Sequence, residues 1–218
     1  MKKYFSFAGI LLSLLSFHAS ADSNVEFYVG QSDYGLKGGD YADSFKKSIS
    51  FKAVYIKEFS DSFFGEVFLQ ANDESKGSTV ITPEETNSED PGRYFDVSGA
   101  INTTSIGVGV GDSFYKTKYF QVDGRLGINL WYLTLDESVF SVRSNGDSFP
   151  ISGVVIINNE RFNASESKVG ISPYASASAS VSLSEHRKIG VSFSITQVEV
   201  GDESVNLASG LLFLKYTF

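Results

Sequence analysis

The stretch that decides the fold runs from Tyr119 to Leu135 and reads YFQVDGRLGINLWYLTL. Every second residue from Phe120 to Tyr132 is apolar or glycine, and the residues between them include Gln121, Asp123 and Arg125. Because successive side chains of a strand point to opposite faces, this spacing predicts a β-strand with one apolar and one polar face. Helical spacing of apolar residues is almost absent from the chain, so an all-β protein is expected.

The same alternation recurs along the chain and defines eight candidate strands. One of them, 95–111, is irregular, because Val97 and Ile101 have the opposite parity to Ile106, Val108 and Val110. A β-bulge near 101–104 would reconcile the two halves. The predicted strands are 25–34, 46–58, 62–72, 95–111, 119–135, 167–183, 188–200 and 205–218.

The connections between these segments alternate in length. Short connections at 59–61, 112–118 and 184–187 alternate with longer ones, of which 73–94 and 136–166 are the longest, and only 201–204 breaks the rule. Short turns at one end and long loops at the other are typical of barrels that span the outer membrane. The predicted fold is therefore an eight-stranded antiparallel up-and-down transmembrane β-barrel.

The polar face of the strands decides which way the apolar face points. In a soluble barrel the apolar face points inward and the exterior carries many lysines and glutamates. Here the polar face holds mainly serine, glycine and scattered charges, and aromatic residues gather near the strand ends, as at membrane interfaces. The apolar face is therefore expected to contact lipid, and a soluble periplasmic barrel that binds a small ligand stays as an alternative.

The first 21 residues have the pattern of a secretory signal peptide. Lys2 and Lys3 precede an apolar run from Phe5 to Phe17, and Ala19-Ser20-Ala21 is a small-residue cleavage site. We expect residues 1–21 to be removed and residues 22–218 to form one domain. Without Lys2 and Lys3, the 18 basic residues become 16 against 26 acidic ones, a net charge of −10. Such a chain is a poor partner for nucleic acid, and it has no cysteine for disulfides.

Five charged residues on the polar faces form the first group of candidate functional residues. A lysine or arginine that faces lipid at mid-depth costs about 2–4 kcal/mol, so these side chains are expected to point into the lumen. A gate or selective pore is one interpretation of the group. The other is a plug of salt bridges, because eight strands leave room for little more than side chains and buried charges pair. The predicted lumen charge network consists of Lys52, Glu66, Asp123, Arg125 and Lys168.

The second group lies at the end of the last predicted strand, where 210–218 reads GLLFLKYTF. Leu212, Leu214, Tyr216 and Phe218 alternate and should face lipid, whereas Phe213 and Lys215 should face the lumen or its rim. Together with the signal peptide and the eight segments, this strand resembles those of the small bacterial outer-membrane barrels of the OmpX/Ail and OmpA-transmembrane-domain type. The resemblance implies a location in the outer membrane, and recognition of the last strand by the barrel-assembly machinery.

The resemblance also implies a role at the cell surface. We expect adhesion, colonisation or another host interaction through 73–94 and 136–166, with outer-membrane lipid, lipopolysaccharide and host surface proteins as partners of a monomer. Within 136–166, SVFSV and GVVIINN are expected to pair as a hairpin above the membrane. The alternatives are a small pore or a purely structural envelope protein. A lipid-modifying enzyme is disfavoured, because His186 lies in a predicted inner turn and His18 in the signal peptide. The pattern predicts no cofactor and no metal site.

Overall fold

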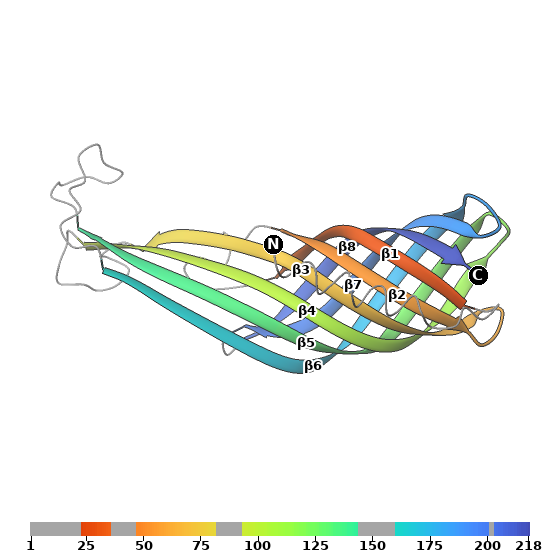
Figure 1. Ribbon diagram of the computed structural model, residues 1–218, viewed down its shortest axis with the longest axis horizontal. Coiled ribbons are helices and arrows are strands. Elements are labelled where there is room, and N and C mark those ends of the chain that lie inside the picture. The colour runs from red at the N-terminus through yellow and green to blue at the C-terminus, as the bar shows by residue number, and fades with distance from the viewer. Residues whose placement is uncertain (1–22, 36–46, 82–92, 144–159, 201–202) are drawn as a thin grey trace.

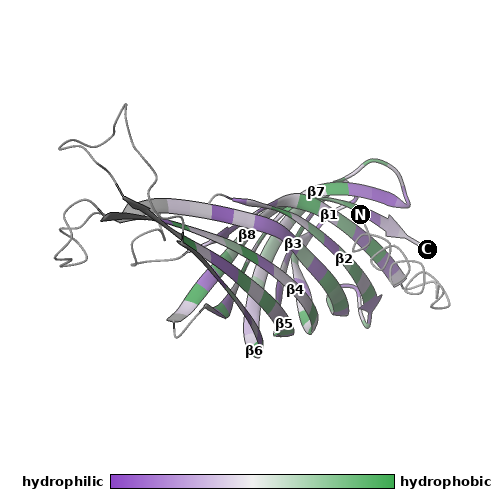
Figure 2. Cartoon of the chain, turned by 60° about the vertical axis from the view of Figure 1, so that its left-hand side comes forward, coloured by the Kyte–Doolittle hydropathy of each residue, from purple (hydrophilic) through white to green (hydrophobic). Residues whose placement is uncertain are grey.

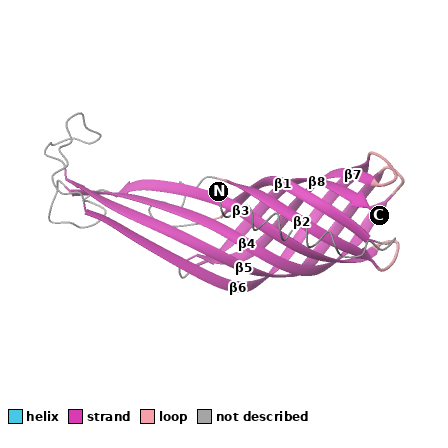
Figure 3. Ribbon diagram, in the orientation of Figure 1, coloured by secondary structure: helices cyan, strands magenta, loops and turns pink. Residues whose placement is uncertain are grey.

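The computed structural model describes residues 23–35, 47–81, 93–143, 160–200 and 203–218, and within these ranges the chain forms eight strands joined in one closed antiparallel barrel (Figures 1 and 3). The predicted fold class is therefore confirmed. The predicted signal peptide lies outside the described residues. The strands are β1 (Ser23–Tyr34), β2 (Ser48–Glu58), β3 (Phe63–Ile81), β4 (Arg93–Lys116), β5 (Phe120–Arg143), β6 (Glu160–Ser182), β7 (Arg187–Val200) and β8 (Glu203–Thr217).

The barrel closes between its first and last strands. β1 pairs with β8 from Asn24 opposite Thr217 to Tyr34 opposite Leu207, and with β2 on its other side. Every strand therefore has two neighbours along the barrel wall, and the backbone groups of the wall find their partners within it. A lipid environment demands this closure, because an unsatisfied backbone group there costs several kcal/mol.

The outer surface of the barrel is an apolar belt. Residues of one parity on each strand are exposed, including Phe51 on β2, Val108 on β4, Leu126 on β5 and Phe193 on β7. Their neighbours of the other parity are buried inside, so the two faces of each strand alternate in hydropathy (Figure 2). An apolar exterior around a partly polar interior is the reverse of a soluble barrel, and it identifies a barrel that spans a membrane.

The two ends of the barrel differ. Turns at 59–62, 117–119 and 183–186 join the strands tightly at the end where Phe218 lies. At the opposite end β3, β4, β5 and β6 run on together well beyond the other four strands (Figure 1). Since outer-membrane barrels turn tightly on the periplasmic side and carry their long segments outside, this four-stranded projection is extracellular. We call it the extension.

The extension corrects two predicted loops. Residues 73–94 and 136–166 were expected to be connections, yet β3 reaches Ile81, β4 begins at Arg93, β5 reaches Arg143 and β6 begins at Glu160. The cause is the change of solvent. Outside the membrane the outward side chains, such as Glu74, Lys76 and Ser78, need not be apolar, and the alternating signal disappears although the strand continues.

The hairpin expected within 136–166 has a different partner for its first segment. Ser138 pairs with Asn163 and Ser141 with Glu160, so the SVFSV segment pairs with the first residues of β6. The expected partner, GVVIINN, lies wholly outside the described residues.

The expected bulge in the fourth strand is misplaced. β4 keeps one parity from Val97 to Ser113, with Val97 and Ile101 facing inward in line with Gly107. Its own bulge lies further on, between Ser113 and Tyr115, where the register with β5 shifts. The irregularity near Ile101 lies opposite, in β3, where the register shifts between Asn72 and Ser75. Val97 and Ile101 are apolar and inward because the extension has a buried inner face, not because the strand changes sides.

Large aromatic rings fill the lumen by lying over glycines of neighbouring strands. A Cβ atom at Gly107 would overlap the ring of Phe68, and one at Gly111 would overlap the ring of Phe64. Gly107 and Phe68 are directly paired across β4 and β3. The glycines of β4 therefore provide the space in which the aromatic side chains of β3 pack.

Among the described residues, no helix has the length and apolar character needed to cross a membrane.

Candidate functional site

The centre of the lumen is an ion cluster around Arg125 of β5. Its Nη1 lies 2.8 Å from Glu26 Oε2 and 2.9 Å from Glu66 Oε2, and its Nη2 lies 3.8 Å from Asp123 Oδ2. These carboxylates come from β1, β3 and β5, so the guanidinium ties three strands together across the barrel. All four side chains are nearly fully buried. Burial of this kind is tolerated only because each charge has an opposite charge in contact.

Two tyrosines complete the cluster. The Tyr28 hydroxyl donates to Glu26 and accepts from Arg125 Nη1 at 3.0 Å, and the Tyr174 hydroxyl donates to Glu66. The carboxylates thus accept hydrogen bonds from neutral donors as well as from the guanidinium. Such saturation of lone pairs is what a buried charge network requires to be stable.

Lys215 links this cluster to the periplasmic mouth. Its Nζ lies 3.9 Å from both Glu26 Oε1 and Glu58 Oε1, and Glu58 also pairs with Lys116 at 3.7 Å. Among the described residues, the buried charged side chains are three acids and three bases: Glu26, Glu66, Asp123, Lys52, Arg125 and Lys215. Equal numbers of buried acids and bases, five of the six in ion pairs, are the composition of a plug rather than of a selective ring.

The structure brings four of the five predicted lumen charges inside and leaves the fifth apart. Lys52, Glu66, Asp123 and Arg125 are buried in the lumen. Lys168 lies higher, near the extension, where its Nζ is 3.5 Å from Glu166 Oε1 and its side chain is partly exposed. The prediction that Lys168 belongs to the lumen network was wrong. β6 pairs with β7 only as far as Tyr174, so at Lys168 the two strands have already separated and the inner face of β6 is open to solvent.

Glu26 and Lys215 are part of the cluster and were missed from sequence. Both follow the inward parity of their strands, Glu26 between Val25 and Phe27, and Lys215 between Leu214 and Tyr216. The inward position of Glu26 and Lys215 could have been predicted from this alternation, which already placed Lys215 at the lumen or its rim. What sequence did not contain is that β1 and β8 set Glu26 directly opposite Lys215.

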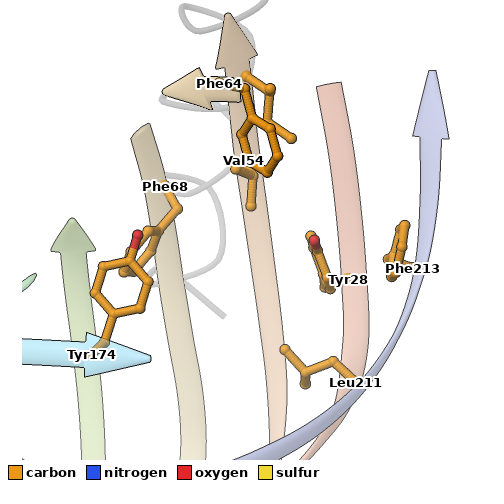
Figure 4. Close-up of a cluster of buried hydrophobic side chains, with 8 residues drawn as sticks. Tyr28, Val54, Phe64, Phe68, Tyr174, Leu211 and Phe213 are labelled. Atoms are coloured by element: carbon orange, nitrogen blue, oxygen red, sulfur yellow. The ribbon is translucent and has the colours of Figure 1, made fainter. Parts of the chain in front are cut away.

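An aromatic layer surrounds Lys52 of β2. Its Nζ lies 4.1 Å from the ring centroid of Phe68 and 5.6 Å from those of Tyr28 and Tyr174. The rings of Phe68 and Tyr174 meet edge to face at 4.9 Å, as Figure 4 shows. Tyr28 and Phe213 pack on the other side of the layer at 4.8 Å. Ring faces carry negative potential and therefore stabilise a buried ammonium group.

Polar and apolar layers follow toward the extracellular end. Ser32 hydrogen bonds to Ser209 at 2.5 Å and donates to Asn72 at 3.1 Å, forming a belt of small polar groups. Above it a second buried apolar cluster closes the lumen across five strands, and its Trp131 donates to Ser172 at 2.9 Å. This upper cluster contains Tyr34, Ile101, Trp131, Leu133, Leu135, Val198, Val205 and Leu207.

The four predicted residues of the last strand lie on its outer face. Leu212, Leu214, Tyr216 and Phe218 are 58, 46, 40 and 42% exposed, whereas Phe213 and Lys215 between them are almost fully buried. Tyr216 and Phe218 contact each other edge to face at 5.1 Å at the periplasmic rim. Their role in assembly stays a prediction.

The outer face of the extension is a shallow polar groove of about 900 Å³ across β3, β4, β5 and β6. Within it Ser165 donates to Asp136 at 2.6 Å, and Ser138 donates to Asn163 at 3.0 Å. Glu74 and Lys76 form an exposed ion pair at 3.1 Å. The groove is lined by short polar and charged side chains with glycines and alanines between them.

The extension also has two strand edges that no described strand covers. β2 pairs with β3 only as far as Asn72, and β7 pairs with β6 only as far as Tyr174. The β6 edge begins at Pro173, whose carbonyl accepts from the Thr196 hydroxyl at 2.9 Å and therefore faces β7. Proline has no N–H to give to a ladder, which explains why the two strands separate at this residue.

The described residues show no group of side chains arranged for metal binding. They contain no group of three or more histidine, cysteine, aspartate or glutamate side chains placed to hold a metal ion. His186 lies in the turn at 183–186, at the end opposite the extension, with its ring 6.4 Å from that of Tyr216.

The architecture fixes where the protein resides. A closed barrel with an apolar outer belt, tight turns at one end and projecting strands at the other is that of bacterial outer-membrane proteins. The chain is a small eight-stranded barrel of the bacterial outer membrane.

Comparisons with known proteins find solved structures of low sequence identity. No protein-family model and no curated protein sequence matches the chain. The chain is similar to the crystal structure of Ail, the attachment invasion locus protein of Yersinia pestis, with 16% identity, 90% of this chain and 97% of that chain covered, and a TM-score of 0.47. It is also similar to the crystal structure of the outer membrane protein OprG of Pseudomonas aeruginosa, with 11% identity, 92% of this chain and 97% of that chain covered, and a TM-score of 0.45. For the crystal structure of Neisserial surface protein A the identity is 10%, 90% of this chain and 96% of that chain are covered, and the TM-score is 0.40.

Proposed function

We propose that this protein acts at the bacterial surface, binding partners in adhesion, colonisation or another host interaction through its extension. The observation that supports this most is the extension itself, in which four strands continue together into the extracellular space while the other four stop. A structural barrel needs no strands outside the membrane. Function concentrates in segments that a rigid scaffold holds out in this way.

The two uncovered edges give the proposal a mode of binding. A strand edge presents unpaired N–H and C=O groups to which an extended segment of a partner protein adds as a new strand. On β6 the odd-numbered residues from 163 to 171 share the orientation of Pro173, so their backbone groups face the uncovered side. Host surface proteins with an exposed strand are the proposed partners.

The filled lumen argues against the alternative of a pore. The ion cluster, the aromatic layer and the upper apolar cluster occupy successive levels of the interior. We further propose a non-enzymatic monomer with lipid and lipopolysaccharide around its belt. The last strand, with Leu212, Leu214, Tyr216 and Phe218 on its outer face, is proposed as the segment that the assembly machinery recognises.

Binding to host cells tests the proposal. The purified protein in lipid nanodiscs is compared with a variant whose β3–β4 and β5–β6 hairpins are shortened to tight turns at the membrane surface, removing 73–94 and 136–166. Binding should be lost, while the shift in gel mobility on heating shows that the barrel still folds. Unchanged binding by a folded, shortened barrel would exclude the extension as the binding site.

A point substitution tests the edge. Ser167→Pro removes an N–H that faces the uncovered side of β6 and leaves the ladder to β5 intact. Ser167→Ala is the matched control, because both variants lose the hydroxyl that accepts from Tyr132 at 3.0 Å. Strand addition predicts that only the proline variant binds weakly. Equal binding by both variants would show that partners use another part of the extension.

A further inference from the structure

A small cavity lies in the middle of the lumen beside Lys52. It has a volume of about 20 Å³, and its polar lining includes Lys52, Gln70, Ser105, Asn129 and Ser194. A cavity needs about 10–15 Å³ of this kind of volume to hold one water molecule. There is therefore room for a small guest, such as a water molecule or a halide ion.

Lys52 differs from the other buried cations of the lumen. Arg125 and Lys215 each contact carboxylates, whereas Lys52 forms no ion pair and no hydrogen bond with any described residue, although its side chain is only 6% exposed. Three aromatic rings lie against its ammonium group. Rings offset only part of the cost of burying a charge, and Lys52 lines the cavity together with two of these rings, those of Phe68 and Tyr174.

The remaining lining supplies further donors. The side-chain oxygen of Asn129 accepts from the Thr196 hydroxyl at 3.1 Å, which leaves its amide N–H groups without a described acceptor. The hydroxyls of Ser105 and Ser194 likewise have no described partner. An ammonium group, an amide and two hydroxyls thus converge on one atom-sized space.

From this geometry we propose that the cavity binds one monovalent anion of halide type, physiologically chloride. The anion is the contact counter-charge of Lys52, and it accepts hydrogen bonds from Asn129, Ser105 and Ser194. It fills the polar level between the aromatic layer and the upper apolar cluster. A neutral water molecule satisfies the same donors but leaves the ammonium charge without a contact ion.

Diffraction at the bromine absorption edge tests the site on the unaltered protein. Crystals of the full barrel grown with sodium bromide in place of sodium chloride should show an anomalous peak within the cavity, next to Lys52 Nζ. A water molecule there, with no anomalous signal, would overturn the proposal.

Unfolding in lipid or detergent gives a second, solution readout. Sodium gluconate is exchanged for sodium chloride at constant ionic strength, and the urea midpoint is followed. Once chloride exceeds its dissociation constant, each tenfold increase should raise the folding equilibrium constant about tenfold. Lys52→Met should abolish this dependence. Lys188→Met, which removes a cation at the lumen mouth bound to Gln121 at 2.6 Å, should retain it. Identical midpoints of the unaltered protein in gluconate and chloride would refute a bound halide.

Discussion

Arg125 illustrates how a single residue organises the lumen. Its guanidinium contacts Glu26 and Glu66 on two other strands, and its planar shape allows both contacts at once. Glu26 and Glu66 are buried, so bulk water cannot replace the guanidinium if it is removed. The stability of the barrel therefore depends strongly on this residue.

Replacing Arg125 should destabilise the barrel strongly. Arg125→Met leaves Glu26 and Glu66 buried without their main counter-charge, and loss of one partner of a buried pair costs about 3–5 kcal/mol. Urea unfolding followed by gel mobility measures the change. Lys76→Met, which breaks the exposed pair with Glu74, is the control and should shift the midpoint far less. Similar midpoints for the two variants would show that the ion cluster adds no stability.

Gly107 is the second residue whose identity the packing determines. Gly107→Ala places a methyl group against the ring of Phe68, and overpacking of this kind costs about 1–3 kcal/mol. Phe68→Leu in the same chain should restore part of the loss, giving a non-additive double-mutant cycle in urea unfolding. Gly210→Ala is the matched control, since its nearest atom, on Phe193, would be 3.5 Å away. Strict additivity would disprove the glycine–aromatic fit.

At the scale of elements, the alternating pattern predicts which strands exist but not how long they are. All eight strands were predicted, because within lipid the outward residues must be apolar and the period of two is strict. β3, β5 and β6 were predicted too short at their extracellular ends, whereas β4, predicted from 95, begins at Arg93. Outside the membrane water replaces lipid, the outer face accepts polar residues, and the alternating pattern no longer marks the strand.

The edge of β6 makes an element-scale prediction for hydrogen exchange. The amides of Lys168 and Gly170 point toward β5 and should exchange slowly, whereas those of Val169 and Ile171 point to the uncovered side and should exchange rapidly. Exchange of the folded barrel in detergent, read by NMR residue by residue, measures the alternation. Uniform slow exchange from 167 to 171 would mean that the edge is covered in solution.

For the whole molecule, the lumen determines whether the barrel conducts. Eight strands enclose space for little more than side chains, and here charged, aromatic, polar and apolar levels succeed one another inside it. The balance of three buried acids and three buried bases among the described residues leaves no net field to select an ion. A plugged barrel follows from the interior as a whole and from no single residue.

The purified protein should therefore give no steady single-channel current in a planar bilayer. An established porin, reconstituted in the same lipid, confirms that the assay detects insertion and conduction. Regular current steps from this protein that change when Arg125 is replaced by Ala would identify the lumen as a pore and contradict the plug.

Sequence by itself determined the barrel, its outer belt and the orientation of most side chains, because lipid imposes a period of two that is legible in one strand such as 119–135. The same alternation predicted that four charged side chains point into the lumen, those of Lys52, Glu66, Asp123 and Arg125. Only the tertiary structure decided which of these charges meet. Contacts across the lumen depend on the register of strands distant in sequence, as for Glu26 opposite Lys215. The tertiary structure also decided that Lys168 lies outside the ion cluster and that four strands continue outside the membrane. In water the outward residues of those strands need not be apolar, so backbone pairing rather than residue type defines the strands there.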